Sequence, residues 1–360
     1  MNGFKKINLN MKNTLTICNK PNIVYIPLVN NNEDNVLILV KKGDYVFKGS
    51  ILAKVKDDFK VNIFSSVSGK VIDFEEHTIF NGEKVKCVVI ENDFKERMQR
   101  QFDIIDDLNS ISKKDFIESL KNSGIIEDSM PIYTKYDTNN KINTLIIKGF
   151  ENYKGSEYFI IKERIEQLLE MIDSILEINN IPCAIIVIKK ENKELLKYIN
   201  KHIGTYLKIK VVVVSNSFIL KNKNKLVKKL TNTNCEDYLK EGIVISTPSC
   251  IYAMYEALKL HKPITEKVVT FLGDGLKKPQ NVLVKIGTKL SEIISEIGGV
   301  YKTKNLIMIT NIISENIEDL VITQELNTVL VVEKDYGKDF CRRFRKSIDA
   351  RNYVKKQKGK

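Results

Sequence analysis

The feature that most constrains the fold is a regular alternation of strand-like and helix-like segments between residues 144 and 260. The strand-like segments are short and rich in Val and Ile, and amphipathic segments separate them. Strands that are apolar along their whole length are typical of a parallel sheet with both faces covered by helices. Right-handed crossovers would make this a Rossmann-like α/β layer. The predicted strands are Thr144–Lys148, Ala184–Ile188, Ile209–Val214 and Ile243–Ser246.

The helices of this region are predicted from apolar residues at helical spacing. The first precedes the strands and ends at Gly124, because glycine commonly terminates a helix. The longest carries a continuous apolar stripe. The predicted ranges are Lys113–Asn122, Glu157–Ile178, Asn192–His202, 223–231 and Ser249–Leu260.

Residues 36–90 have a different pattern, with short strands separated by turns that contain glycine. Such spacing favours a small barrel or sandwich. The phrases VKKGDYVFKGSILAKV and FSSVSGKVI resemble the biotinyl/lipoyl-type barrel-sandwich hybrid, in which a hairpin can carry a modified lysine. Ser66–Lys70 is accordingly predicted as a hairpin tip, with a structural role favoured over a carrier role for Lys70. The predicted strands are Val36–Val40, Ile51–Val55, Lys70–Phe74 and Lys86–Ile90.

A second β region follows the α/β layer. The sequence predicts strands at Lys267–Leu272 and Asn281–Ile286, and then a helix over Thr288–Ile297. Thr288 is the expected N-cap of this helix, and Gly298-Gly299 is its expected end. Three short strands are predicted within residues 305–333.

Charge and length limit the partners. The 360 residues suggest two or three domains, and the formal net charge is +13. Lys338–Lys360 carries +8 of that charge, so the remaining residues are only mildly basic. Lys outnumbers Arg 51 to 7, although Arg is the residue that base readout favours. We therefore expect no nucleic-acid partner.

The six cysteines are too far apart for a Cys-x-x-Cys metal motif, and no metal site is predicted. The sequence opens with no signal-peptide pattern, and its apolar stretches are of strand length rather than membrane length. These features predict a reduced, cytoplasmic protein, soluble or peripheral on the inner face of the cell membrane.

The order of parts resembles one family, the C subunit of Rnf-type ferredoxin:NAD electron-transport complexes. That family is related to the flavin subunit of complex I and to an RnfC-like protein associated with proline reductase. The most specific stretch is Glu241–Gly299, EGIVISTPSCIYAMYEALKLHKPITEKVVTFLGDGLKKPQNVLVKIGTKLSEIISEIGG.

The resemblance implies a division of the chain into a barrel-sandwich hybrid and three further parts. The second part is an α/β domain like that of the complex I flavin subunit. The third is a β-grasp (SLBB-like) region, and the fourth is a basic tail in place of a ferredoxin-type cluster domain. The boundaries are 1–95, 96–262, 263–335 and 336–360.

The same resemblance implies an FMN site, and Gly124, Gly149 and Glu151 are the residues that match its motifs. The glycine-rich phosphate loop of relatives is otherwise replaced here, and Glu127 and Asp128 stand where a phosphate would have to approach. The resemblance therefore leaves open whether FMN is bound. No catalytic residue is predicted.

The iron–sulfur motif of relatives needs four cysteines. In its register this chain keeps only Cys341, so a [4Fe–4S] cluster is not expected here. A redox thiol activated by Arg342 and Arg343 is an alternative role for Cys341.

Two functions remain open. The first is an accessory or degenerate RnfC-like component of an electron-transfer assembly, which docks other subunits without carrying electrons itself. It has lost its own cluster, and whether it has also lost its flavin is left open. The second is an active NADH-linked oxidoreductase subunit that passes electrons through flavin to partner subunits. The partners implied are a membrane-bound Rnf-type complex or an amino-acid reductase such as proline reductase.

Overall fold

Four parallel strands form one sheet in the order β13-β12-β11-β14. The strands are β11 (Thr144–Lys148), β12 (Ala184–Lys189), β13 (Ile209–Val214) and β14 (Ile243–Ser246). This computed structural model describes residues 12–18, 20–28, 36–55, 61–99, 107–150, 155–215, 223–232, 237–301, 306–309, 313–314 and 319–333.

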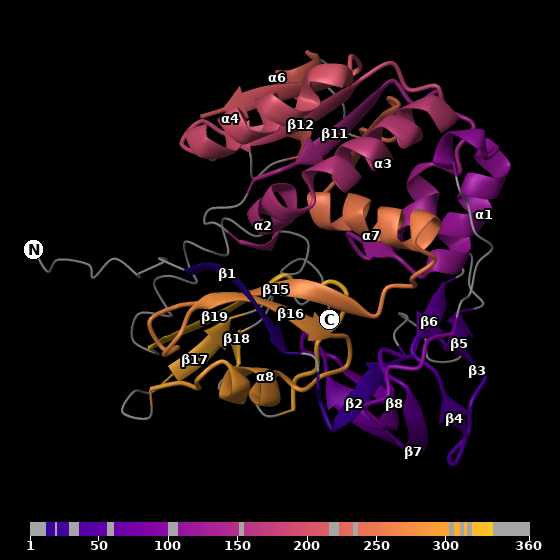
Figure 1. Cartoon of the computed structure of the whole chain (residues 1–360), viewed down its shortest axis with the longest axis vertical. Coiled ribbons are helices and arrows are strands. Elements are labelled where there is room, and N and C mark those ends of the chain that lie inside the picture. The colour runs from indigo at the N-terminus through magenta and orange to yellow at the C-terminus, as the bar shows by residue number, and fades with distance from the viewer. Residues whose placement is uncertain are drawn as a thin grey trace, which may run out of the picture.

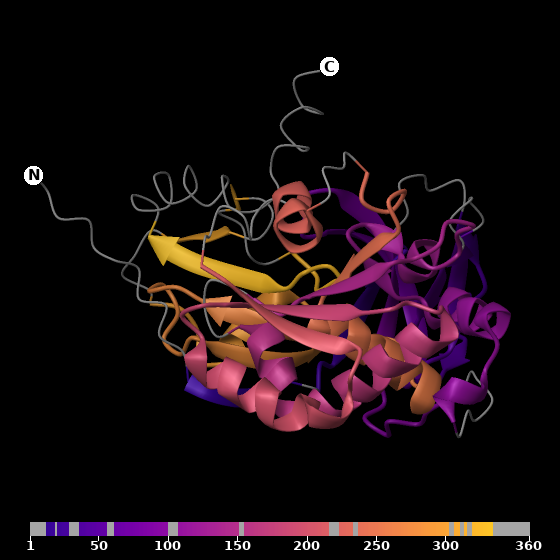
Figure 2. The same ribbon diagram turned by 90° about the horizontal axis from the view of Figure 1, so that it is seen from above.

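Helices cover both faces of this sheet. Alternate side chains of each strand point to opposite faces, and the apolar side chains on both faces need a covering layer. Leu145 and Ile147 of β11 pack into the larger core with helices α1, α3, α4 and α7, whereas Ile146 packs against α6. Figure 2 shows α4 and α6 on opposite sides of the sheet. The helices are α1 (Lys113–Ser123), α2 (Ser156–Glu163), α3 (Ile165–Ile178), α4 (Lys193–His202), α6 (Lys223–Thr231) and α7 (Pro248–Lys259).

The single helix predicted over Glu157–Ile178 is in fact two. Arg164, with φ −134° and ψ 27°, separates α2 from α3. The break lets α2 approach the second β region, where the backbone N–H of Ser156 donates to Thr270 Oγ1 at 2.8 Å. Figure 1 shows α2 and α7 lying between the parallel sheet and that second β region.

The N-terminal barrel consists of two sheets that enclose a core of aliphatic side chains. The sheets have the orders β2-β8-β7-β4 and β3-β5-β6, and Val24, Leu52 and Val88 are among their fully buried residues. The strands are β2 (Ile23–Pro27), β3 (Val36–Ile38), β4 (Tyr45–Val46), β5 (Ile51–Val55), β6 (Asn62–Phe64), β7 (Gly69–Thr78) and β8 (Lys84–Asn92).

The prediction of a hairpin tip at Ser66–Lys70 is wrong. The strands on either side, β6 and β7, belong to different sheets, and the side chains of Ser65, Ser66 and Ser68 are fully buried. Ser66 Oγ donates to the carbonyl of Ile286 at 2.6 Å. This turn therefore fastens the barrel to the second β region and is not an exposed tip of the kind that carries a modified lysine.

The second β region is a six-stranded sheet of order β1-β16-β15-β19-β17-β18. Its edge strand β1 lies parallel to β16 although some 260 residues separate them, a pairing that the sequence analysis did not anticipate. The predicted three short strands within 305–333 are present. The strands are β1 (Lys12–Cys18), β15 (Glu266–Leu272), β16 (Gln280–Lys285), β17 (Leu306–Ile309), β18 (Ile313–Ser314) and β19 (Thr328–Glu333).

Helix α8 (Leu290–Glu296) packs on this sheet and begins later than predicted. Lys289 is its N-cap residue, and the hydroxyl of Thr288 donates instead to the carbonyl of Lys285 at 2.9 Å. Gly298 and Gly299 end the helix as predicted, both with positive φ.

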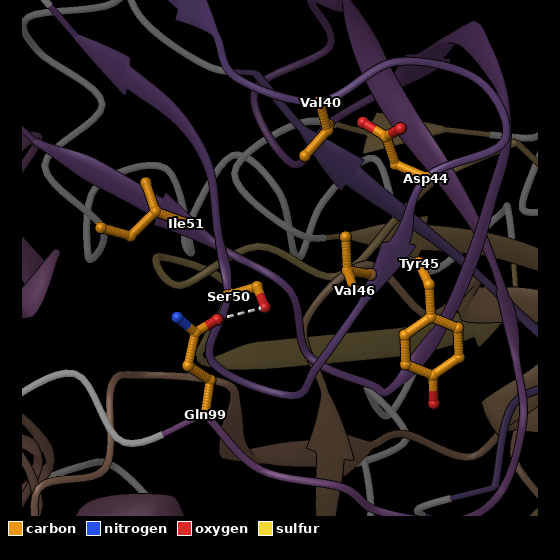
Figure 3. Close-up of a pocket in the computed structure, with 7 residues that line it drawn as sticks. All are labelled: Val40, Asp44, Tyr45, Val46, Ser50, Ile51 and Gln99. Carbon is orange, nitrogen blue, oxygen red and sulfur yellow. Dashed lines mark hydrogen bonds between the residues drawn. The ribbon is translucent and has the colours of Figure 1, made fainter.

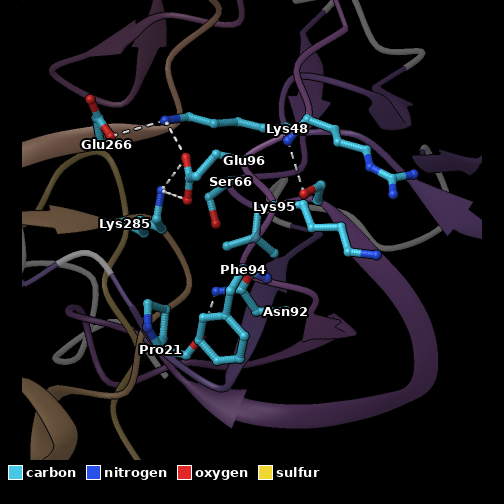
Figure 4. Close-up of polar contacts among 12 residues, drawn as sticks. Pro21, Lys48, Ser66, Asn92, Phe94, Lys95, Glu96, Glu266 and Lys285 are labelled. Atoms are coloured by element: carbon cyan, nitrogen blue, oxygen red, sulfur yellow. Dashed lines mark hydrogen bonds and ion pairs between the residues drawn. The ribbon is translucent and has the colours of Figure 1, made fainter.

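Ion pairs also join the barrel to the second sheet (Figure 4). The ammonium of Lys285, whose side chain is 1% exposed, lies 2.9 Å from Glu96 Oε1. Lys48 contacts both Glu96 and Glu266, at 3.3 and 3.2 Å. Each cation therefore lies beside a carboxylate from the other part, which fixes the two relative to each other.

Candidate functional site

The amino end of α7 lies where an α/β sheet commonly binds a ligand, at the carboxyl ends of its strands. Ser246 is the last residue of β14 and pairs with Ile147 of β11. Thr247 follows as the N-cap, and its side chain accepts from the N–H of Cys250 at 3.3 Å. Pro248 at the first helical position suits a helix start. The first N–H groups of a helix have no partner within the helix. Together with the helix dipole, they make such an end attractive to an anion.

The carboxylate of Glu127 already occupies that end of the helix. Its Oε1 accepts from the backbone N–H of Thr247 at 2.8 Å and from the Thr247 hydroxyl at 2.7 Å. Its Oε2 accepts from Ser246 Oγ at 2.8 Å. Glu127 is only 8% exposed. These three bonds therefore replace the hydrogen bonds to water that its carboxylate loses on burial.

Lys135 supplies the counter-charge from the 3₁₀ turn η3 (Ile132–Lys135). Its ammonium lies 2.6 Å from Glu127 Oε2 and donates to the carbonyl of Ile245 at 2.8 Å. Burial alone would lower the pKa of Lys135, but the nearby charges, chiefly those of Glu127 and Asp128, and the hydrogen bond to Glu127 together outweigh burial and raise the pKa above its ordinary value. Lys135 is therefore held in its charged form beside Glu127.

A second carboxylate caps the same helix end. Glu157 of α2 accepts from the N–H and the hydroxyl of Ser249, both at 2.8 Å. Burial raises the pKa of Glu157, and the nearby charge of Glu127 adds to the rise. Two side chains of this chain thus take the N–H groups of Thr247 and Ser249 that an external anion would need.

Glu127 is positioned by a tight hairpin between β9 (Ile126–Glu127) and β10 (Met130–Pro131). The two turn residues, Asp128 and Ser129, both have left-handed backbones, with φ 56° and 62°. Left-handed values at both central positions are typical of a type I′ turn. Asp128 also lies 2.8 Å from the ammonium of Lys223 in α6.

The segment that precedes β19 in the six-stranded sheet holds this hairpin in place. The N–H and the hydroxyl of Ser129 donate to Glu325 Oε1 at 2.8 and 2.9 Å. Gln324 accepts from the N–H of Ile126 at 3.1 Å and donates to the carbonyl of Gly124 at 2.9 Å. The hairpin is therefore bonded to three parts of the fold: α7, α6 and the segment before β19.

Of the residues predicted for a flavin site, Gly124 ends α1 with φ 71°. A Cβ at this position would lie 2.5 Å from the carbonyl oxygen of Asn62 in β6, so the glycine is needed for close packing on the barrel. Gly149 follows β11, and a Cβ there would lie 2.9 Å from Ile161 Cδ1. Glu151 lies outside the described residues.

Cys341 and the basic tail also lie outside the described residues. Within the described ranges no group of three or more His, Cys, Asp or Glu side chains could hold a metal ion. Cys18 and Cys87 are free, and burial raises the pKa of each thiol to about 12. No helix in the part of the chain that the structure describes is long and apolar enough to span a bilayer.

Sequence reasoning identified Glu127 only as an obstacle to a phosphate and missed its partners Lys135, Ser246 and Thr247. The available signal was the Thr247-Pro248-Ser249 start of α7, which has a favoured N-cap residue followed by proline.

Known proteins of one class, the C subunits of Rnf-type complexes, are similar to this chain. The family described as the RnfC barrel sandwich hybrid domain matches residues 5–95, which include the barrel strands β2 to β8. The chain is 25% identical over 290 residues to the C subunit of the proton-translocating ferredoxin:NAD(+) oxidoreductase complex of Clostridium ljungdahlii. It is 20% identical over 290 residues to the C subunit of the Na(+)-translocating complex of Acetobacterium woodii.

Residues 5–95 thus match the RnfC barrel-sandwich domain, and most of the chain is similar to C subunits of Rnf-type complexes, the resemblance that its sequence predicted. Each alignment covers 78% of this chain, but only 63% and 66% of the two relatives. Among solved structures, NAD+-reducing [NiFe]-hydrogenase in the air-oxidized state aligns with a TM-score of 0.55 at 12% identity. That alignment covers 66% of this chain and 50% of the hydrogenase chain. At this identity the match shows a shared fold.

Proposed function

We propose that this chain is a docking component of an Rnf-type electron-transfer assembly that carries neither an iron–sulfur cluster nor a flavin of its own. The assembly is suggested by the relatives, which are named as C subunits of ion-translocating or ferredoxin:NAD(+) oxidoreductase complexes. Other electron-transfer subunits are then its partners, and attachment would be peripheral on the inner face of the membrane. The relatives' names give no support to an amino-acid reductase as partner.

One observation carries the absence of flavin, namely the carboxylate of Glu127 on the N–H and hydroxyl groups at the start of α7. The phosphate of FMN would need such N–H groups and would meet Glu127, Glu157 and Asp128 there. Glu127 and Glu157 already accept from the N–H groups of Thr247 and Ser249, so a phosphate would have to displace both carboxylates. The residues present do not fit the phosphate, so no electron transfer through a flavin is derived for this chain.

The remaining parts are assigned as scaffold. We interpret residues 96–262 as a Rossmann-like domain of the complex I flavin-subunit type and residues 263–335 as a β-grasp region. The strand order β16-β15-β19-β17-β18 supports the second assignment, with β15 antiparallel to β16 and parallel to β19. In this interpretation Gly124 and Gly149 keep the family register but serve packing.

The test is an anaerobic purification of the full chain with a visible spectrum and an iron determination. We expect no flavin band at about 450 nm, a position set by the cofactor's own chemistry, and no stoichiometric iron. FMN added in excess should leave after gel filtration. A chain that retains one flavin would overturn the proposal and favour an active NADH-linked oxidoreductase subunit.

A further inference from the structure

The tip of the hairpin between β7 and β8 is buried in the core of the six-stranded sheet region rather than in the barrel. Its residues Ile79 and Phe80 are 1% and 7% exposed. They lie in the same core cluster as Leu320 and Val321, in the segment before β19. The N–H of Val321 donates to the carbonyl of Thr78 at 3.1 Å, and Thr78 pairs with Leu320 in a parallel bridge. The barrel is therefore docked on the second sheet by this tip.

His77 lies at the base of the docked tip, between two carboxylates. Its Nδ1 is 2.7 Å from Oδ1 of Asp319, which belongs to the segment before β19. Its Nε2 is 3.2 Å from Oε2 of Glu75, which lies on β7 itself. The other oxygen of Asp319 accepts from the hydroxyl of Thr78 at 3.1 Å. The side chain of His77 is 5% exposed, so water reaches little of the ring.

These two contacts specify the protonation state of the ring. A neutral imidazole carries one N–H, whereas the imidazolium carries two. An ionised carboxylate can only accept, so a ring nitrogen without a hydrogen would set its lone pair against that of Glu75 or Asp319. Both contacts are hydrogen bonds only when both nitrogens of His77 are protonated. The docked arrangement therefore includes a bound proton at this position.

The other groups packed on the ring come from β2 and β8. The ring of Tyr25 lies against the imidazole with centroids 4.2 Å apart, and the ammonium of Lys289 lies 4.4 Å from the centre of that same tyrosine ring. Burial raises the pKa of the Cys87 thiol to about 12, and the charges of Asp319 and Glu75 add to the rise, so this thiol is neutral. Among the residues that the structure describes, the two carboxylates are the charged groups in direct contact with the ring.

We propose that His77 is a proton-dependent link that holds the hairpin tip on the six-stranded sheet region. When the ring gives up a proton to solvent, the remaining N–H stays on the shorter contact, with Asp319, and the bare Nε2 faces Glu75. The ring is then neutral, and its bond to Asp319 loses the strength that charge on both partners gave it. Histidine changes charge between about pH 5 and 8, so docking of the tip weakens as the pH rises through that range.

This link goes beyond the docking role proposed above for the whole chain. It depends neither on the identity of the assembly nor on the absence of flavin, because it rests on contacts within the chain alone.

The opposite end of β7 supplies a matched control. There Asp44 lies on the wall of a pocket beside Tyr45 (Figure 3), and its backbone carbonyl accepts from the N–H of Val71 at 2.9 Å. From Val71 to His77 the strand extends for about 20 Å. Asp44 is therefore a carboxylate of the same barrel that is out of reach of the ring.

The test follows the ring and the docked tip in the same full chain. The chain has three histidines, so NMR of histidine labelled at its ring nitrogens, with His77→Gln for assignment, reports on this ring. We expect both nitrogens to be protonated at about pH 5.5 and one to be bare at about pH 8.5. Over that range the protection factor of the Val321 amide, which corrects hydrogen exchange for its intrinsic pH dependence, should fall about fivefold.

Four variants separate the link from general stability. Asp319→Asn should lower the protection factor at about pH 5.5 and remove most of its pH dependence, because the ring then has no anion on the sheet side. Glu75→Gln should move the fall to lower pH, because one of the two anions that hold the proton is gone. Asp44→Asn and His202→Gln, which change a distant carboxylate and a distant histidine, should behave as the parent chain does.

Thermal unfolding at about pH 6, near the middle of the range in which histidine titrates, establishes which variants fold, and Glu75→Gln carries the test even where the substitution of His77 itself prevents folding. A ring that carries one proton at about pH 5.5 would overturn the proposal. A Val321 protection factor that is constant with pH, or a fall that occurs at the same pH in Glu75→Gln as in the parent chain, would overturn it as well.

Discussion

The ammonium of Lys135 lies 2.6 Å from Oε2 of Glu127, and each side chain is less than a tenth exposed. This buried ion pair stands at the amino end of α7, where the carboxylate also accepts from Thr247 and Ser246. A charge in such a place is tolerated only when it is paired and hydrogen-bonded. The pair therefore makes the hairpin and the parallel sheet depend on each other for stability.

Replacement of Glu127 by Gln tests this dependence. The amide keeps the size of the side chain but leaves the ammonium of Lys135 buried with Asp128 as its nearest carboxylate, at 3.6 Å. We expect the free energy of unfolding to fall by about 3 kcal/mol, the order found when one partner of a buried pair is removed. Urea denaturation at neutral pH measures the change, and Glu163→Gln on an exposed part of α2 provides the control.

The double variant Glu127→Gln with Lys135→Met separates charge from packing. Removal of both charges should recover part of the loss, because no ammonium then remains unpaired. A double variant as unstable as the sum of the two single variants would show that the two charges do not stabilise each other.

Gly124 offers a second prediction, which concerns stability rather than ligand binding. Alanine there must adopt φ 71° and place its Cβ 2.5 Å from the Asn62 carbonyl oxygen. We expect Gly124→Ala to destabilise the fold by at least about 2 kcal/mol. Gly204 has open space around its Cβ position, so Gly204→Ala should change stability by less than about 0.5 kcal/mol. Equal thermal midpoints for the two variants would contradict this view of Gly124.

Glu256, near the end of α7, should make the stability of the fold depend on pH. Burial raises the pKa of Glu256 to about 7, and the charge of Glu266 adds to the rise, while Lys262, Arg164 and Lys48 oppose it. The native state then holds a proton that the unfolded state has lost between about pH 4.5 and about pH 7. The contribution of Glu256 to stability is full below that window and is lost as the pH rises through it.

Glu256→Gln should therefore be more stable than the parent chain at about pH 8, by about 1 to 2 kcal/mol after allowance for its partial exposure. At about pH 4.5 this advantage should be absent. Urea denaturation of both chains across this range gives the comparison, and a difference that does not vary with pH would exclude a raised pKa.

The ion pairs between the barrel and the six-stranded sheet give a further prediction. Glu96→Gln leaves Lys285 buried without its carboxylate. We expect a loss of about 2 kcal/mol, below the usual value for a buried pair because water reaches Glu96. Glu91→Gln, also exposed and in the neighbouring strand β8, is the control. A loss no larger than that of the control would show that Lys285 is solvated in the native state.

The elements predicted best from the sequence are those with a regular pattern of apolar residues. The ranges Ile209–Val214 and Ile243–Ser246 are found as predicted, because a continuous β-branched run allows little besides a buried strand. The break at Arg164 was not foreseen, since the apolar stripe of α2 and α3 continues across it. The break separates α3 from α2, whose first residue Ser156 bonds to Thr270 of β15, a contact distant in sequence.

The candidate site was harder to predict because its partners are distant in sequence. Glu127 and Thr247 are 120 residues apart, and nothing local to either shows that a carboxylate would cap that helix. At Ser66 the local sequence predicted exposure, whereas the side chain is buried. A Ser-Gly turn is typical of an exposed tip, and only the carbonyl of Ile286 explains its burial.

The parallel pairing of β1 with β16 has a consequence for the order of folding. During synthesis Lys12–Cys18 emerges long before Gln280–Lys285, its neighbour in the finished sheet. Closing so long a loop delays the contact, and Cys18 can take its place in the completed core only after β16 has been made. The edge of the six-stranded sheet is therefore completed only late, by a strand from the opposite end of the chain.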